Sequence, residues 1–220
     1  MARLIAISRH RIATDGKGVT TLVAFHGCPL DCRYCLNKQC KDEAHKYPEY
    51  SPARLLEEVR VDDLYFQATG GGVTFGGGEP LLHPDFIAEF RELCPPEWKI
   101  NVESSLAVPM QNVQKIAPLA DCMIIDIKDL DDDIYRRYTG RSNALLMSNL
   151  RWIAEVGLQD KCKVRLPLIK GYNSRNSISR SRIKLAVMGF RYFDEFKYII
   201  KNDATPDTDS VSEHAAHMFG

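Results

Sequence analysis

The sequence predicts an α/β protein, an open partial (β/α)6 barrel built on a parallel sheet. Strand-like apolar runs alternate with helical patterns along the chain, and this alternation is typical of βα units. About six such units can be counted, fewer than the eight that close a full barrel. Polar and sulfur-containing residues follow several of these strands, at the end where catalytic loops gather in α/β barrels.

The size and charge of the chain set its broad class. It has 220 residues and a formal net charge of zero. This length suits one domain, which we expect to cover residues 1–201, followed by a polar tail at 202–220. Zero net charge gives no electrostatic reason to expect a nucleic acid partner. Because neither a run of about 18 apolar residues nor a signal-peptide core is visible, we expect a cytoplasmic monomer that does not contact membranes.

The elements of the first half follow local signals. Glycines at 16 and 18 make a loop of residues 14–18. Ser51 and Pro52 offer the N-cap and the first-turn proline of a helix. The elements expected in this half are a short edge strand at 4–8, a strand at 19–26, a helix at 52–68, a buried strand between glycine turns within 70–80, and a helix that begins at Pro84.

The second half continues the alternation. Apolar runs predict strands at 99–102, 122–127 and 162–169, and a sixth strand at 195–201. Helical patterns between them predict a modest helix around 113–119 and helices at 131–138, 144–156 and 177–188. We therefore expect the special residues at the strand ends to converge on one mouth of the barrel.

Three cysteines on one short loop are the strongest chemical signal. Cys28, Cys32 and Cys35 have the spacing C-x3-C-x2-C directly after the strand at 19–26. Structural zinc sites usually have four ligands, and disulfide frameworks have even cysteine counts and an extracellular setting. Three thiolates suit a [4Fe–4S] cluster better, with the fourth iron left for another ligand. Zinc and a purely structural role stay as alternatives.

The other cysteines have a simpler interpretation. The chain has seven cysteines, an odd number that the reducing cytosol would keep as thiols. Four of them are scattered singly through the predicted helices and strands, and we expect these to be buried structural residues: Cys40, Cys94, Cys122 and Cys162.

An iron with an open position can chelate a small ligand through an amine and a carboxylate. S-adenosylmethionine (SAM) has this pair, together with a sulfonium that can accept one electron. Its reductive cleavage yields methionine and a 5′-deoxyadenosyl radical. The protein must then bind the cofactor, direct its reactive carbon and exclude competing partners.

Residues near the cysteines are candidates for holding this cofactor. Gly77 and Gly78 let a backbone edge approach a ligand, and the carboxylate of Glu79 can accept from its ammonium. A glycine turn with a solvated glutamate is the alternative. Tyr34 lies between two ligand cysteines and can stack near adenine or shield the cluster, or it is an ordinary packed aromatic.

Charged residues at later strand ends are further candidates. Asp126 and Lys128 point to the same side of a strand and need a partner or a ligand if that strand is buried, although a surface pair is possible. Arg165 can bind a carboxylate bidentately or form a structural ion pair. Glu103 and Ser104 can complete a ribose or cation site, or simply cap their strand.

Together these residues resemble the radical SAM superfamily, whose hallmark is the C-x3-C-x2-C loop. More narrowly, the chain is similar to the activating enzymes of glycyl-radical enzymes, of which pyruvate formate-lyase activating enzyme is the best known. Segments that carry this resemblance lie in family order at Asp15–Gly18, Gly71–Pro80, Asp126–Lys128, Tyr138–Gly140, Ser142–Asn143 and Val164–Asn173.

The resemblance implies a site and a reaction. It implies one [4Fe–4S] cluster on Cys28, Cys32 and Cys35, with SAM contacts from Tyr34, Cys35, Leu36, Gly78, Asp126, Ile127 and Lys128. The family removes a hydrogen from one glycine of a large partner enzyme, with electrons from a donor such as flavodoxin or ferredoxin. A stand-alone radical SAM enzyme acting on a peptide or small molecule is the alternative, and a non-catalytic metal-binding module is a third.

The sequence departs from the family in three places. The ferredoxin-like insertion that many members carry after the cysteine loop is absent, so no auxiliary cluster is expected. The late histidine of a Leu-Pro-Tyr-His-like stretch has no match at 196–201, and the last helical region is missing. His214 and His217 could substitute for that histidine, or they are exposed tail residues.

Overall fold

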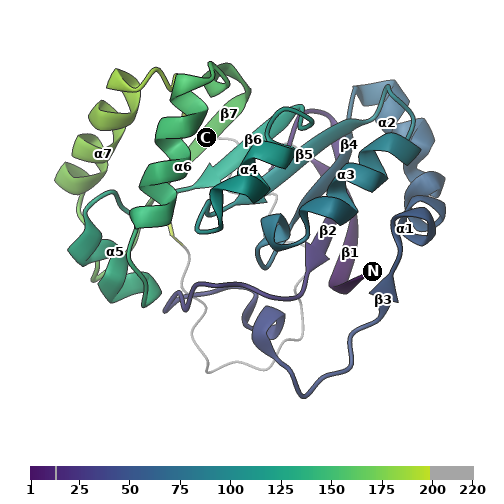
Figure 1. Cartoon of the computed structure of the whole chain (residues 1–220), viewed down its shortest axis with the longest axis horizontal. Helices are drawn as coiled ribbons and strands as arrows, with labels where there is room; N and C mark the ends of the chain where they lie inside the picture. The colour runs from purple at the N-terminus through teal and green to yellow at the C-terminus, as the bar shows by residue number, and fades with distance from the viewer. Residues whose placement is uncertain (13, 199–220) are drawn as a thin grey trace.

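Among the described residues, eight strands form one sheet that does not close into a full barrel (Figure 1). The computed structural model describes residues 1–12 and 14–198. The order of the strands across the sheet is β3-β1-β2-β4-β5-β6-β7-β8. Their bounds are Ala2–Ile12 (β1), Val19–Phe25 (β2), Glu49–Tyr50 (β3), Gly72–Gly77 (β4), Lys99–Ser104 (β5), Cys122–Asp126 (β6), Cys162–Leu168 (β7) and Tyr192–Lys197 (β8).

Six of these strands are parallel, which confirms the predicted (β/α)6 arrangement. Strands β2, β4, β5, β6, β7 and β8 pair in parallel in that order. Their carboxyl ends therefore lie along the same edge of the sheet. The short strand expected at 4–8 is instead β1, an 11-residue strand antiparallel to β2. It is not the outermost strand, because β3 pairs with its first residues.

In the part of the chain that the structure describes, seven α-helices connect the strands and pack outside the sheet (Figure 1). In this view α3, α4 and α6 lie in front of the strands, with α1 and α2 at one end and α5 and α7 at the other. Their bounds are Pro52–Val59 (α1), Asp63–Thr69 (α2), Pro84–Leu93 (α3), Met110–Ile116 (α4), Asp132–Thr139 (α5), Ala144–Glu155 (α6) and Arg175–Val187 (α7).

The helix expected at 52–68 is broken in two. Ser51 caps its start as predicted, by accepting a hydrogen bond from the backbone N–H of Arg54. A 3-10 turn at Arg60–Asp62 then separates α1 from α2. The buried Asp62 of this turn accepts hydrogen bonds from Thr21 of β2 (2.7 Å) and Arg9 of β1 (2.9 Å). The break thus brings a carboxylate onto the sheet, which hydrophobic periodicity does not reveal.

The core lies between the sheet and its helices. The largest fully buried side chains include Phe25, Phe75 and Phe90, whose rings form edge-to-face or tilted contacts. Burial of such rings is the main stabilising contribution of the fold. Among the described residues no helix combines the length and apolarity needed to cross a membrane.

Two elements near the carboxyl end of the described residues begin earlier than predicted. Helix α7 begins at Arg175, two residues before the expected 177, because Ser174 caps it through the Ser177 N–H. Strand β8 begins at Tyr192 rather than 195. Residues 199–201 of the expected strand lie outside the described residues. So does the predicted tail, 202–220, with its two histidines, His214 and His217.

Candidate active site

The cysteine loop leaves the carboxyl end of β2 at Gly27, a glycine with a positive φ of 96°. The Gly27 N–H donates to the Cys40 carbonyl at 2.7 Å, so the loop returns to the point where it began. Two further backbone bonds dock it on the end of α5: Asp31 N–H to Thr139 O (2.8 Å) and Arg33 N–H to Tyr138 O (3.1 Å). These anchors fix the loop at the mouth of the barrel.

All seven cysteines are free thiols, and Cys28, Cys32 and Cys35 are half-buried. Contact with the buried thiol of Cys40 lowers the pKa of Cys35 to about 6 and also lowers the pKa of Cys28. Burial raises the pKa of Cys32 to about 12. Cys40 is thus buried as predicted, and it lies directly beside two of the candidate ligands.

The three thiols suit a cluster better than a single ion. Within 1–12 and 14–198, no group of three histidine, cysteine, aspartate or glutamate side chains converges closely enough to hold one metal ion. A four-iron cube needs no such convergence, because each thiolate binds a different iron. The free, half-buried thiols on one anchored loop therefore fit the predicted [4Fe–4S] group.

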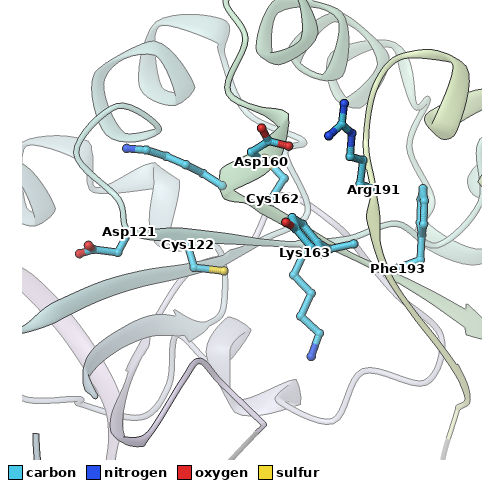
Figure 2. A pocket seen from close by; sticks show the side chains of 9 residues that line it. Asp121, Cys122, Asp160, Cys162, Lys163, Arg191 and Phe193 are labelled. Atoms are coloured by element: carbon cyan, nitrogen blue, oxygen red, sulfur yellow. The ribbon is translucent and has the colours of Figure 1, made fainter. Parts of the chain in front are cut away.

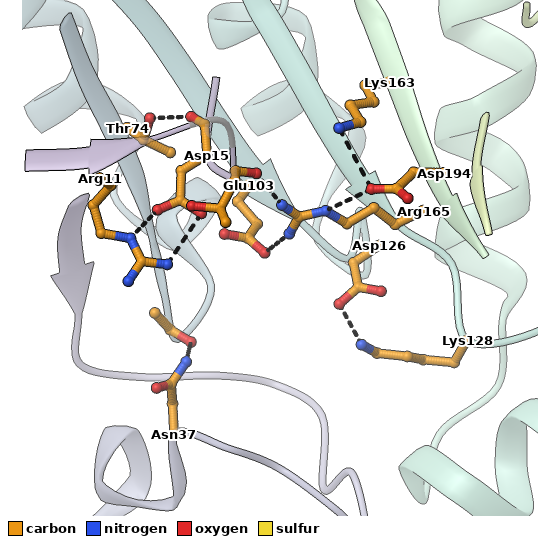
Figure 3. Close-up of polar contacts among 12 residues, drawn as sticks. Arg11, Asp15, Asn37, Thr74, Glu103, Asp126, Lys128, Lys163, Arg165 and Asp194 are labelled. Atoms are coloured by element: carbon orange, nitrogen blue, oxygen red, sulfur yellow. Dashed lines mark hydrogen bonds and ion pairs between the residues drawn. The ribbon is translucent and has the colours of Figure 1, made fainter. Parts of the chain in front are cut away.

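The glycine segment at the end of β4 is bonded directly to the cysteine loop. Gly78 N–H donates to Phe25 O at 3.0 Å, and Asn37 Nδ2 donates to Gly77 O at 3.0 Å (Figure 3). A Cβ at Gly78 would lie 2.2 Å from the Gly27 carbonyl oxygen. The close approach that requires glycine here is thus an approach to β2. A backbone contact of Gly77 or Gly78 with SAM stays a prediction.

Glu79 is fully buried and makes several hydrogen bonds within the protein. Its oxygens accept from the Ser104 hydroxyl (2.7 Å), the Ser105 hydroxyl and N–H (2.6 and 2.9 Å) and the Leu81 N–H (3.2 Å). Burial raises the pKa of Glu79, and these bonds oppose that shift. Four donors fill the acceptor positions of a carboxylate. In this structure Glu79 and Ser104 therefore join β4 to β5, and their predicted cofactor contacts stay untested.

Charged side chains from several strands form a connected network beside the sheet (Figure 3). Arg165 on β7 pairs with Glu103 on β5, donates to the Thr14 carbonyl at 2.5 Å and lies 3.9 Å from Asp194 on β8. Burial raises the pKa of Glu103, and Arg165 opposes that shift. Arg165 is therefore surrounded by carboxylates of the protein itself, which is the structural ion pair that we weighed against ligand binding.

Asp126, the last residue of β6, and Lys128, just beyond it, form an ion pair, which is the alternative that we weighed against ligand binding. Burial alone lowers the pKa of Lys128, but Asp126 and Cys32 more than offset this and raise it, so the ammonium stays charged. Asp126 Oδ1 is buried and has no hydrogen-bond partner among the described residues. A buried acceptor without a donor is costly, so this atom fits a donor from a bound ligand. Ile127 is different, because its side chain is fully buried in the core.

Sequence reasoning missed a group of aromatic rings beside the cysteine loop. Tyr34 packs against Tyr172 (5.6 Å between ring centroids) and Tyr138 (6.1 Å), and Tyr138 lies 6.5 Å from Tyr198. Tyr34 is thus a packed aromatic, while Leu36 is exposed. The tyrosines come from four separate segments, so no local pattern could have grouped them. The bond from Asn37 to Gly77 was also missed, although Asn37 lies only two residues after the last motif cysteine.

A pocket of about 510 Å³ lies elsewhere in the protein (Figure 2). It is at the amino ends of β6, β7 and β8, opposite the edge that carries the cysteine loop. Its lining includes Asp121, Cys122, Cys162 and Lys163. Cys94 and Cys162 are buried as predicted, but Cys122 is only partly buried because it faces this opening.

Two activating enzymes are among the proteins to which this chain is similar. The chain is 33% identical over 145 residues to the pyruvate formate-lyase-activating enzyme of Clostridium pasteurianum, covering 66% of this chain and 60% of that protein. It is 39% identical over 124 residues to the (2S)-3-sulfopropanediol dehydratase activating enzyme of Klebsiella oxytoca, covering 56% and 38%. The chain thus matches less than two thirds of the length of each of these relatives.

A solved structure supports the fold, and a family model identifies the superfamily. The crystal structure of Streptococcus suis SuiB bound to S-adenosylmethionine matches with a TM-score of 0.62 at 15% identity, covering 83% of this chain and 43% of SuiB. The family model of the radical SAM superfamily matches residues 22–176, which include the cysteine loop and strands β4 to β7. Proteins of this superfamily bind a [4Fe–4S] cluster and SAM, and the three cysteines are present here. The chain belongs to the radical SAM superfamily.

Proposed function

We propose that this protein reductively cleaves SAM and uses the resulting 5′-deoxyadenosyl radical to abstract hydrogen from a glycine of a partner glycyl-radical enzyme. The observation that carries this proposal is the cysteine loop itself, bonded to the glycine strand and docked on α5 in a chain similar to two activating enzymes. The expected setting is the cytoplasm, and the donor is a one-electron carrier such as flavodoxin or ferredoxin.

The residues of the site have distinct roles in this proposal. Cys28, Cys32 and Cys35 hold the cluster, which when bound supplies the electron that breaks a carbon–sulfur bond of SAM. Asp126 Oδ1 accepts an N–H or O–H of the cofactor, because this buried atom has no other donor among the described residues. Lys128 stays charged beside Cys32 and can donate to a carboxylate. The buried ring of Tyr138 and the partly buried ring of Tyr34 pack beside the loop and limit the access of water to it.

The open sheet suits a protein substrate. Among the described residues, β8 pairs with β7 alone, so the six parallel strands leave a gap where a closed barrel would continue. An extended loop of a partner can reach the mouth through such a gap. We therefore favour a glycine in a partner protein as the hydrogen donor.

Anaerobic reconstitution with iron and sulfide tests the chemistry. Dithionite and SAM should then give 5′-deoxyadenosine, and a candidate partner should acquire a glycine-centred EPR signal. Cys32→Ala should lose both the roughly four irons and the cleavage, whereas Cys94→Ala removes a buried thiol next to Arg91 and should keep both. Cleavage without any glycine signal would favour a stand-alone enzyme. Full turnover by Cys32→Ala would refute the cluster assignment.

A further inference from the structure

The formal charge of zero hides a strong segregation of charge. Residues 136–191 contain 13 lysines and arginines but only two acidic residues. Residues 42–97 contain 12 acidic residues but only four lysines and arginines. The first segment includes α6 and α7 and the second includes α1, α2 and α3, which lie toward opposite ends of the molecule in Figure 1. The segment rich in lysine and arginine begins within α5, whose end is bonded to the cysteine loop.

Four exposed cations gather where the cysteine loop meets α5. We call this group the basic surface; its members are Arg33, Lys41, Arg137 and Arg141. Arg33 lies in the loop between two candidate cluster ligands, and its N–H bonds Tyr138 O at the end of α5. Arg137 lies in the last turn of α5 and donates to the Tyr172 carbonyl at 3.3 Å. The basic surface is thus the outer side of the cluster-binding loop.

Nearby acidic groups do not cancel this charge. Asp31 lies among the four cations and pairs with Lys41, which lowers the pKa of Asp31; Arg141 and Arg33 add to the shift. Asp132, on the first turn of α5, pairs with Arg136 at 2.5 Å, and neither belongs to the basic surface. Asp42 and Glu43 follow Lys41 in the chain, and Glu43 pairs with Arg3. Among the described residues, Arg33, Arg137 and Arg141 form no ion pair with a carboxylate, so these three leave an excess of positive charge beside the cysteines.

We propose that the basic surface is the docking site of an acidic one-electron carrier protein that reduces the cluster, an inference that rests on the proposed function. Electron transfer weakens steeply with distance, so the donor must approach the cluster ligands, and the basic surface is exposed protein that adjoins them. Electron-transfer partners form small, charge-guided interfaces. One electron passes from the donor's flavin hydroquinone to the cluster, which leaves a flavin semiquinone on the donor.

A matched pair of charge reversals tests this surface. Arg33→Glu/Arg141→Glu changes the basic surface, and Arg151→Glu/Arg180→Glu makes the same change of net charge at exposed positions on α6 and α7. The measurement is the rate at which reduced flavodoxin reduces the reconstituted cluster, followed by EPR at low and high salt. The first variant should be slowed by about 10-fold or more at low salt, and the control by less than about two-fold.

Reduction by dithionite distinguishes the loss of the docking site from the loss of the cluster. Dithionite is a small reductant that needs no docking site, so both variants should be reduced by it as the unmodified protein is. Equal flavodoxin rates in the two variants would overturn the proposal. So would a flavodoxin rate of the unmodified protein that does not fall as salt rises, because this test needs no variant. Absence of any dithionite-reducible cluster would instead refute the proposed function, and the docking site with it.

Discussion

The hydroxyl of Tyr198 donates a hydrogen bond to the backbone carbonyl of Tyr34 at 2.9 Å. This bond joins residues 164 positions apart, the residue just after β8 and the middle of the cysteine loop. The Tyr198 ring also lies 5.8 Å from the ammonium of Lys128. The last parallel strand thus holds the loop that begins at the end of the first.

Removing that hydroxyl should loosen the loop. Tyr198→Phe keeps the ring and loses the bond, which should lower the free energy of unfolding by about 1 kcal/mol. The reconstituted protein should also lose iron faster to a chelator, since the backbone between two ligand cysteines loses a restraint. Tyr65→Phe on the exposed side of α2 is the control and should change neither quantity. Equal iron loss in the two variants would contradict the expectation.

The Arg165–Glu103 pair should contribute strongly to stability. Both side chains are largely buried, with 13% and 25% of their surfaces exposed. Arg165→Met leaves Glu103 in a buried site without its cation, which should lower the free energy of unfolding by about 3 kcal/mol in denaturant titrations. The double variant Arg165→Met/Glu103→Gln should recover part of this loss, because the unpaired charge is gone.

An exposed pair gives the comparison. Arg182 lies 3.5 Å from Glu195 with 59% and 45% of the side chains exposed, so Arg182→Met should cost less than about 0.5 kcal/mol. If Arg165→Met and Arg182→Met lowered the free energy of unfolding equally, burial would not determine how much an ion pair contributes to stability.

Two neighbouring glycines should respond differently to an added methyl group. At Gly78 a Cβ meets the backbone oxygens of Gly27 (2.2 Å) and Phe25 (2.7 Å), which can move only with β2 and the cysteine loop. Gly78→Ala should therefore lower the free energy of unfolding by about 2–3 kcal/mol and reduce iron incorporation. At Gly76 the nearest atom is the flexible Leu22 Cδ1 at 3.1 Å, so Gly76→Ala should be milder on both measurements.

His83 should make stability depend on pH. Burial against Phe25, whose ring is 5.0 Å away, lowers the pKa of this imidazole. As the pH falls below about 6.5, His83 binds a proton in the unfolded chain but not in the folded chain. The contribution of His83 to stability is therefore lost on acidification. Thermal unfolding at pH 7.5 and 5.5 should show a smaller pH effect for His83→Gln. An unchanged pH effect would mean that other groups cause it.

Local patterns predicted the order of the elements but few of the contacts between them. The six parallel strands and the cysteine loop follow from apolar runs, glycine turns and one motif, all of which lie within short segments. The full length of β1 was not predicted, because its second half is mostly polar and only partly buried or exposed, so no apolar run marks it. The partners of Arg165 come from three other segments, 14, 103 and 194. Contacts between such distant segments depend on how the whole chain folds.

Strand β8 also bears on how the protein avoids self-association. Among the described residues, the edge of β8 away from β7 has no strand partner, and such an edge presents backbone groups that could pair with another copy, a common route to aggregation. Asp194 and Glu195 occupy the middle of this six-residue strand. In a symmetric antiparallel pairing centred on either residue, a carboxylate would stand opposite its own copy, and like charges in that position repel. Lys163 and Arg165 lie near Asp194, and Arg182 lies near Glu195, so these cations offset part of the repulsion. The remaining negative charge at the centre of β8 should still disfavour edge-to-edge pairing.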